Sequence, residues 1–241
     1  SDVEMQDPEF LDLDVPKQNA FKGLWSTLPG YFVVGPPGVG KTKLATEVVR
    51  RRFVSDRSSR LLVSAQGHDA LDNLQEKIKE TLAANALNDL LVVRSATGEK
   101  RPTNDDEVQK VGLGYIADLD SSNMAKSAPA PLRERLSVLH KAAQRREAEK
   151  NALSKEQRSD LGAVANLVLD AANIVISTAN SPDIERLVEA RAQFDWVLVE
   201  EAAKATGPEL VGPLMLSGRR LLIGDHNQLP PLDAERLLKV F

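Results

Sequence analysis

The sequence contains no cysteine among its 241 residues. This absence excludes a disulfide framework and cysteine-ligated zinc, and it fits a reducing, intracellular compartment, most simply the cytoplasm. The three histidines stand far apart, at positions 68, 140 and 226, which argues against a histidine metal cluster. The sequence has no apolar run of 18 or more residues and no signal-peptide pattern, so we expect no membrane-spanning segment and no membrane partner.

The sequence also lacks a strong charge of either sign, with a formal net charge of -4. The bulk charge therefore argues neither for nor against a nucleic-acid partner, although a local basic strip remains compatible with it. A hydrophobic content of 42% is enough for a sizeable core. The length of 241 residues predicts one large domain or a domain with an insertion.

The chain opens at Ser1 rather than at methionine, and the motif DPEF at 7–10 fits a cloning remnant or a native loop equally well. We therefore interpret the chain as an excised or processed piece. Residues 1–14 are treated as an N-terminal tail, and residues 1–10 are left out of the fold argument. The remainder, 15–241, is expected to form one domain.

Short apolar runs alternate with amphipathic helical segments along most of the chain. Helical spacing is visible after the first run (Leu44, Val48, Val49, Phe53) and after the second (Leu71, Leu74, Ile78, Leu82). Buried runs separated by amphipathic helices are typical of a parallel α/β sheet. The expected strands are 31–34, 61–64, 90–94, 174–178, 196–200 and 220–224.

Residues 95–155 break this alternation and are expected to form a helical or irregular insertion. Residues 99–130 are polar and only weakly periodic, whereas 131–150 predicts a helix opened by a proline. From Arg133 to Lys150 there are six Lys or Arg residues against three Glu, which suits either a docking helix or a solvated one. The expected apolar face of this helix consists of Leu132, Leu136, Leu139 and Ala143.

The motif GPPGVGKT at 35–42 fits the G-x-x-x-x-G-K-[ST] pattern, between a predicted strand and a predicted helix. Glycines allow the backbone to wrap closely around phosphate, and the helix N-terminus adds positive potential. Lys41 is expected to reach the outer phosphates and Thr42 to hold Mg²⁺. The nucleotide-binding loop is assigned to Gly35, Pro36, Pro37, Gly38, Val39, Gly40, Lys41, Thr42 and Lys43.

The motif WVLVEE at 196–201 is an apolar run that ends in two acids. Alone, it fits a buried strand with a charged end. Beside a P-loop, a strand that ends in acid is where Mg²⁺ is held and the attacking water is activated. On that interpretation Glu200 is the metal-side acid, and Glu201 positions or deprotonates the water.

A further apolar run ends in the motif GDHNQLPP at 224–231. Asp225 and Gln228 follow the expected strand, at an edge that would face the phosphates. Gln228 is expected to hydrogen-bond a γ-phosphate oxygen, and Pro230 and Pro231 would stiffen the loop. Taken alone, the segment fits an ordinary loop equally well.

These motifs, with LLVSAQGHDALDNL at 61–74 and IVISTANS at 174–181, resemble in order the first RecA-like domain of a superfamily 1 helicase. The most similar type is the up-frameshift-like branch, which translocates 5′ to 3′ on RNA or DNA. The resemblance covers roughly 15–98 and 156–241. It implies a three-layer P-loop NTPase fold, ATP and Mg²⁺ as cofactors, and single-stranded RNA or DNA as a partner.

The resemblance also implies roles for residues outside the P-loop. Gln18 stands where the family places an adenine-contacting glutamine, although it also fits a surface glutamine. The segments 65–68 and 177–180 stand where the family contacts the nucleic-acid backbone, although small polar residues there also fit helix caps. The implied nucleic-acid residues are Gln66, Gly67, His68, Thr178 and Asn180.

The chain departs from the family pattern at two positions. The family usually has Asp where Glu200 stands and often Gln where Lys204 stands, so a slow or altered hydrolysis rate would be compatible with the sequence. Only ten residues follow Pro231, too few for the second RecA-like domain that closes the ATP cleft. Two alternatives to a motor therefore stay open, a nucleotide-gated regulatory or scaffold subunit and, less well supported by GDHNQLPP, a kinase.

Overall fold

The computed structural model describes residues 7–95, 107–148 and 154–225. The chain divides into two compact units. Residues 1–100 and 173–241 form the first, which we call the sheet unit, and residues 101–172 form the second, the helical unit. In the described part of the chain, no helix combines the length and the apolar character needed to cross a membrane.

The sheet unit is built on six strands that pair in the order β1-β6-β5-β2-β4-β3. Every strand pair is parallel, which confirms the predicted α/β class. Three strands, β2, β4 and β5, are buried at every position because helices cover both of their faces. The strands are β1 (Gly30–Val34), β2 (Leu61–Ala65), β3 (Val92–Arg94), β4 (Ile174–Thr178), β5 (Trp196–Glu200) and β6 (Arg220–Gly224).

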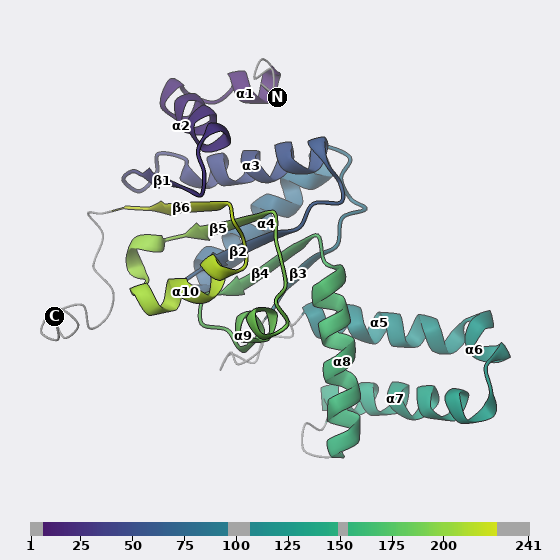
Figure 1. Cartoon of the computed structure of the whole chain (residues 1–241). Coiled ribbons are helices and arrows are strands. Elements are labelled where there is room, and N and C mark those ends of the chain that lie inside the picture. Colours follow the sequence, from purple (N-terminus) through teal and green to yellow (C-terminus); the bar gives the residue numbers. More distant parts are fainter. Residues whose placement is uncertain (1–6, 96–106, 149–153, 226–241) are drawn as a thin grey trace, which may run out of the picture. The chain divides into compact units, whose positions relative to one another are not determined.

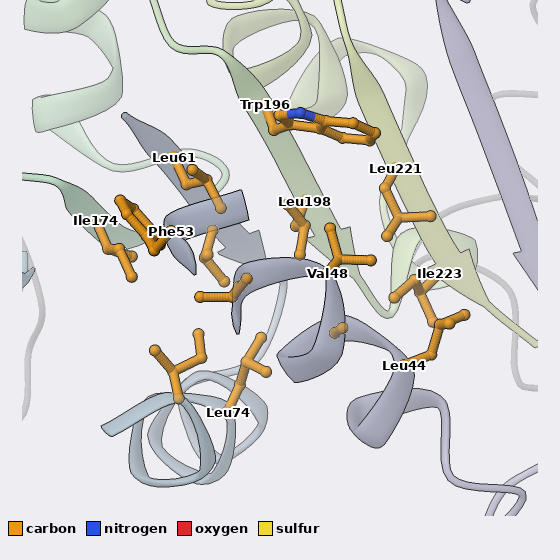
Figure 2. Packing of buried hydrophobic residues seen from close by; sticks show 14 of the residues in the cluster. Leu44, Val48, Phe53, Leu61, Leu74, Ile174, Trp196, Leu198, Leu221 and Ile223 are labelled. Carbon is orange, nitrogen blue, oxygen red and sulfur yellow. The ribbon is translucent and has the colours of Figure 1, made fainter. Parts of the chain in front are cut away.

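Helices lie on both faces of the sheet, giving the predicted three layers (Figure 1). One face is covered by α2 (Val15–Ser26), α3 (Lys41–Ser55) and α4 (His68–Ala84), and the other by α9 (Pro182–Glu189) and α10 (Gly207–Met215). Figure 2 shows Val48 of α3 beside Leu198 of β5, and Phe53 of α3 beside Leu61 and Ile174. The same core includes Leu44, Leu61, Leu74, Ile174, Trp196, Leu221 and Ile223.

The N-terminal segment contributes to this core through α1 (Pro8–Leu11). Phe10 is only 2% exposed and belongs to the core cluster, so leaving it outside the fold is wrong. Asp7 caps α1 by accepting from Phe10 N at 3.1 Å, and it pairs with Arg50 and Arg51 of α3. The Arg51 guanidinium also lies over the Phe10 and Phe21 rings. An apolar side chain and a charge network therefore hold the segment against α3.

The helical unit contains α5 (Glu107–Ser121), α6 (Asn123–Ser127), α7 (Ala130–Ala148) and α8 (Lys155–Ala171). Two of these helices occupy the weakly periodic residues 99–130, and α8 extends the unit beyond the expected boundary near 155. A capping box between Ser154 and Gln157 begins α8. The core is small: Ile116, Ala142, Ala143 and Leu161, with Leu113, Leu136, Leu139 and Val164 packed around it.

The predicted helix 131–150 corresponds to α7, but its apolar face is shorter than expected. Leu136, Leu139 and Ala143 contact the small core, whereas Leu132 is 59% exposed. Helical spacing predicts which side chains share a face. It does not predict how far a neighbouring helix extends along that face.

Candidate functional site

The loop between β1 and α3 has the backbone that a phosphate-binding loop requires. Gly38 and Gly40 both have φ values of 79°, a left-handed conformation that favours glycine. A Cβ at position 40 would also lie 2.9 Å from Lys17 Cε, so the position is crowded. Gly35 N donates to Gly224 O at 3.1 Å, which fixes the start of the loop to the end of β6.

Lys41 is the first residue of α3, and its side chain turns back over the loop. Its Nζ donates to Gly35 O at 2.6 Å and to Pro36 O at 2.8 Å. The ammonium is therefore held at the loop itself, where backbone amides and the N-terminus of α3 add positive potential. This is where a phosphate cradle needs a cation.

Glu200 ends β5, paired in register with Ala65 of β2. Its side chain is buried, and this burial raises the pKa of its carboxyl above the ordinary glutamate value. Glu201 adds to the rise, whereas a hydrogen bond with Thr42 and the charge of Lys41 oppose it. The P-loop and the end of β5 thus meet through Thr42 and Glu200, although β6 lies between β1 and β5 in the sheet.

Glu200 Oε1 is buried and has no hydrogen-bond partner among the described residues. A carboxylate oxygen in that state calls for a cation or a donor, because an unsatisfied buried charge is costly. Carboxylate and hydroxyl oxygens are hard ligands that suit Mg²⁺, which takes few protein ligands and keeps waters and phosphates for the rest. Thr42 and Glu200 therefore fit Mg²⁺.

Glu201 leaves the strand in a left-handed conformation, with a φ of 53°. Its Oε1 accepts from Lys204 Nζ at 2.6 Å. Its Oε2 lies 3.6 Å from where a Cβ at Gly67 would be. Glu201 therefore lies near the start of α4, directly after Glu200, and Lys204 contacts it.

The expected nucleic-acid residues follow β2 and β4 at the same edge of the sheet. Ala65 and Thr178 are register partners, so the segments 65–68 and 177–180 emerge side by side. Thr178 is buried, whereas Asn180 is exposed. Gln66 Nε2 donates to Glu209 Oε2 at 2.8 Å, so its amide is attached to the capping box of α10.

The other expected residues are placed less centrally. Gln18 lies in α2, and its Nε2 donates to Leu13 O at 2.8 Å. Asp225 is buried directly after β6. Gln228 lies outside the described residues.

Two side chains at the site were not predicted from the sequence. Lys17 forms an ion pair with Asp14, and its Nζ lies 3.3 Å from where a Cβ at Gly40 would be, so it adds a cation beside the P-loop. Arg94 ends β3 and is 3% exposed, with His68 and Asp72 of α4 beside it. The one available signal for Arg94 was an arginine at the end of a buried apolar run.

A parallel sheet with a glycine loop, a lysine over that loop and a buried acid beside the loop's threonine defines a P-loop nucleotide-binding domain. A family described as "AAA domain" matches residues 12–233, and the chain belongs to this family. The resemblance to the first domain of superfamily 1 helicases, in the up-frameshift-like branch, is confirmed by its relatives.

Three relatives carry this conclusion. The Drosophila melanogaster protein "Regulator of nonsense transcripts 1 homolog" is 29% identical over 206 residues, covering 85% of this chain and 16% of the relative. An Arabidopsis thaliana protein of the same name is 28% identical over 230 residues, covering 93% of this chain and 16% of the relative. The Schizosaccharomyces pombe "DNA polymerase alpha-associated DNA helicase A" is 29% identical over 212 residues, covering 82% of this chain and 29% of the relative. The chain thus spans less than a third of each of these relatives.

Proposed function

We propose that this chain is the ATP-binding and ATP-hydrolysing first motor domain of a superfamily 1 RNA or DNA helicase-like protein. ATP binding would be coupled to single-strand translocation or unwinding. The observation that carries the proposal is the convergence of Lys41, Thr42 and Glu200, with a buried carboxylate oxygen that lacks a described partner. The Schizosaccharomyces pombe relative, which is named as a DNA helicase, supports the same class and does not favour a scaffold subunit.

Each residue of the site has a distinct role in this proposal. Lys41 binds the outer phosphates, and Thr42 and Glu200 hold Mg²⁺. The metal neutralises phosphate charge when bound. Glu201 orients the attacking water and accepts its proton at a carboxylate oxygen, a task for which its partly exposed side chain beside Lys204 leaves it accessible. Gln18 would contact adenine, and Asp225 and Gln228 would contact the phosphate side.

Nucleic acid and a second domain complete the proposal. Backbone-contacting groups after β2 and β4 suit single-stranded RNA or DNA without sequence preference. A second RecA-like domain, further along the same protein or on a partner, would close the ATP cleft and supply arginine. Without it, this chain is expected to bind nucleotide better than it hydrolyses it. The absence of cysteine fits an intracellular, cytoplasmic setting.

The substitution Lys41→Ala tests the nucleotide site. It removes the phosphate cation, and we expect ATP affinity to fall at least about tenfold, as for one lost charge-assisted contact. Titration of a fluorescent ATP analogue with Mg²⁺ measures this. Lys77→Ala is a matched control, because Lys77 is an exposed lysine of α4 paired with Glu80. Equal affinity in wild type and Lys41→Ala would overturn the P-loop assignment.

The substitution Glu201→Gln tests the water-activating role. It keeps the shape of the side chain and removes its proton acceptor, so ATP binding should persist while turnover falls about a hundredfold or more. Phosphate release under single-turnover conditions measures this. Persistence of wild-type turnover would remove Glu201 from the mechanism while leaving the binding site intact.

A further inference from the structure

Lys17 is a lysine of α2 whose ammonium lies against the P-loop. Its side chain is 17% exposed, and its ammonium pairs with Asp14, the N-cap of the same helix. Its Cε lies 2.9 Å, and its Nζ 3.3 Å, from where a Cβ at Gly40 would be. Gly40 is the N-cap of α3. A helix outside the P-loop motif therefore places a cation at the residue where α3 begins.

Two further lysines lie close to the same point. Lys41 follows Gly40 and turns back over the loop, where it donates to two backbone carbonyl oxygens. Lys43 Cβ lies 4.0 Å from where a Cβ at Gly40 would be, and its ammonium pairs with Asp12. The N-terminus of α3 adds positive potential. Positive groups gathered at one point repel one another, so the arrangement favours a bound anion.

The ion pair with Asp14 leaves Lys17 able to bind such an anion. An ammonium has three donors, and among the described residues Asp14 is the acceptor that Lys17 contacts. Lys17 can therefore keep its ion pair and donate to a second acceptor at the loop. Asp14 holds the ammonium at the helix end that faces Gly40, because the two residues are one turn of α2 apart.

We propose that Lys17 is a second phosphate-binding cation of the nucleotide site, supplied by α2 and acting beside Lys41. Its ammonium donates to a phosphate oxygen of ATP while it remains paired with Asp14. The inference deepens the proposed function and rests on it, because it needs a nucleotide at the P-loop. The G-x-x-x-x-G-K-[ST] motif specifies Lys41 but no cation from a preceding helix.

The substitution Lys17→Met tests the role, because it keeps an apolar stem beside Gly40 and removes the charge. Titration of a fluorescent ATP analogue with Mg²⁺ should show about tenfold weaker binding, as for one lost charge-assisted contact. Tripolyphosphate, which has neither base nor sugar, competes with the analogue, and its inhibition constant should rise by a similar factor. Lys22→Met is a matched control in the same helix, because the Lys22 ammonium lies over the Phe10 ring, 5.6 Å from its centroid. Both constants should be unchanged in this control.

The substitution Asp14→Asn separates the charge of Lys17 from a structural role of the ion pair. Asparagine keeps a side-chain oxygen that can cap α2, and Lys17 keeps its charge. ATP-analogue binding should therefore be at least as tight as in wild type. Equal losses in Asp14→Asn and Lys17→Met would mean that the ion pair only holds α2 in place, and would overturn the proposal.

The remaining outcomes distinguish this inference from the proposed function. Unchanged constants in Lys17→Met, with binding weakened in Lys41→Ala, would overturn the role of Lys17 and leave the nucleotide site standing. Weaker analogue binding with an unchanged tripolyphosphate constant would place Lys17 at the base or sugar and also overturn it. A wild-type protein that binds no analogue would contradict the proposed function itself. Lys17→Gln, with the same expected losses, serves if thermal denaturation shows that Lys17→Met does not fold.

Discussion

The two units of the chain bury different kinds of side chain. In the described residues, every buried polar or charged side chain belongs to the sheet unit. The buried residues described in the helical unit are all apolar, and its central cluster is two alanines with Ile116 and Leu161. Burying a polar group costs free energy. Among the described residues, only the sheet unit contains such groups.

The location of the buried polar groups explains the difference. Many lie at or just beyond the carboxyl ends of the strands, where ligands bind in open α/β sheets. Glu200, Asp225, Arg94 and Thr178 end or follow four different strands at this edge. A site that binds a polar ligand needs polar groups held rigidly, whereas helices can pack on one another through apolar side chains alone.

The largest expected effect on stability comes from replacing one core side chain in each unit with alanine. Phe53→Ala, at a fully buried position of the sheet unit, should lower the free energy of unfolding by about 3–5 kcal/mol. Leu161→Ala, at a position 6% exposed in the helical unit, should cost about 2 kcal/mol. Both tryptophans, Trp25 and Trp196, lie in the sheet unit with their ring centroids 5.3 Å apart, so their fluorescence reports that unit alone.

Denaturant titration followed by fluorescence and by far-UV circular dichroism separates the two units. Phe53→Ala should shift the fluorescence transition. Leu161→Ala should shift the dichroism signal more than the fluorescence signal. Identical shifts in both signals for both variants would mean that the units unfold as one, and the comparison would fail.

Much of the sheet unit could be predicted from the sequence because its signals are local. An apolar run, a glycine loop and Lys41–Thr42 specify a strand, a phosphate loop and a helix without knowledge of any neighbour. The contacts of Gln66 with Glu209, of Lys17 with Gly40 and of Arg94 with His68 could not be predicted. They join residues far apart in sequence through the packing of helices on the sheet.

The helix α5 shows a second reason for failure. Gly112 and Gly114 weaken its periodicity, so the sequence suggested an irregular segment. In the structure a Cβ at position 112 would lie 3.1 Å from Val164 Cγ1, so this glycine permits a close approach of α5 and α8. A residue that interrupts a helical pattern can therefore serve helix packing, and only the partner helix reveals it.

Two leucines of α7, one packed against the core of the helical unit and one exposed, test where that core ends. Leu136→Ser should destabilise the helical unit by about 2 kcal/mol, because it places a hydroxyl against the apolar cluster. Leu132→Ser, at a position 59% exposed, should change the free energy of unfolding by less than about 0.5 kcal/mol. Dichroism-monitored denaturation measures both, and equal losses would mean that Leu132 is also covered.

The pH dependence of stability tests the buried acid of the sheet unit. Burial raises the pKa of Glu200, so the folded state holds its proton to higher pH than the unfolded state does. Stability should therefore fall as pH rises from the ordinary glutamate pKa through the raised value, and level off above it. Glu200→Gln should remove this dependence of stability on pH. It should also be more stable than wild type at neutral pH without Mg²⁺ or nucleotide. A wild-type stability that rises through the window would contradict the raised pKa.

A last expected effect, of about 1 kcal/mol, concerns two buried serines of the sheet unit that differ in their hydrogen-bond partners. Ser64 Oγ in β2 has no hydrogen-bond partner among the described residues, although the side chain is fully buried. Ser217 Oγ, also buried, accepts from Arg219 N at 2.9 Å and lies 3.0 Å from the carbonyl oxygen of Asp195. Ser64→Ala should therefore stabilise the sheet unit by about 1 kcal/mol, and Ser217→Ala should destabilise it by a similar amount. Fluorescence-monitored denaturation distinguishes a gain from a loss of stability, and a loss of stability in Ser64→Ala would mean that the Ser64 hydroxyl has a hydrogen-bond partner after all.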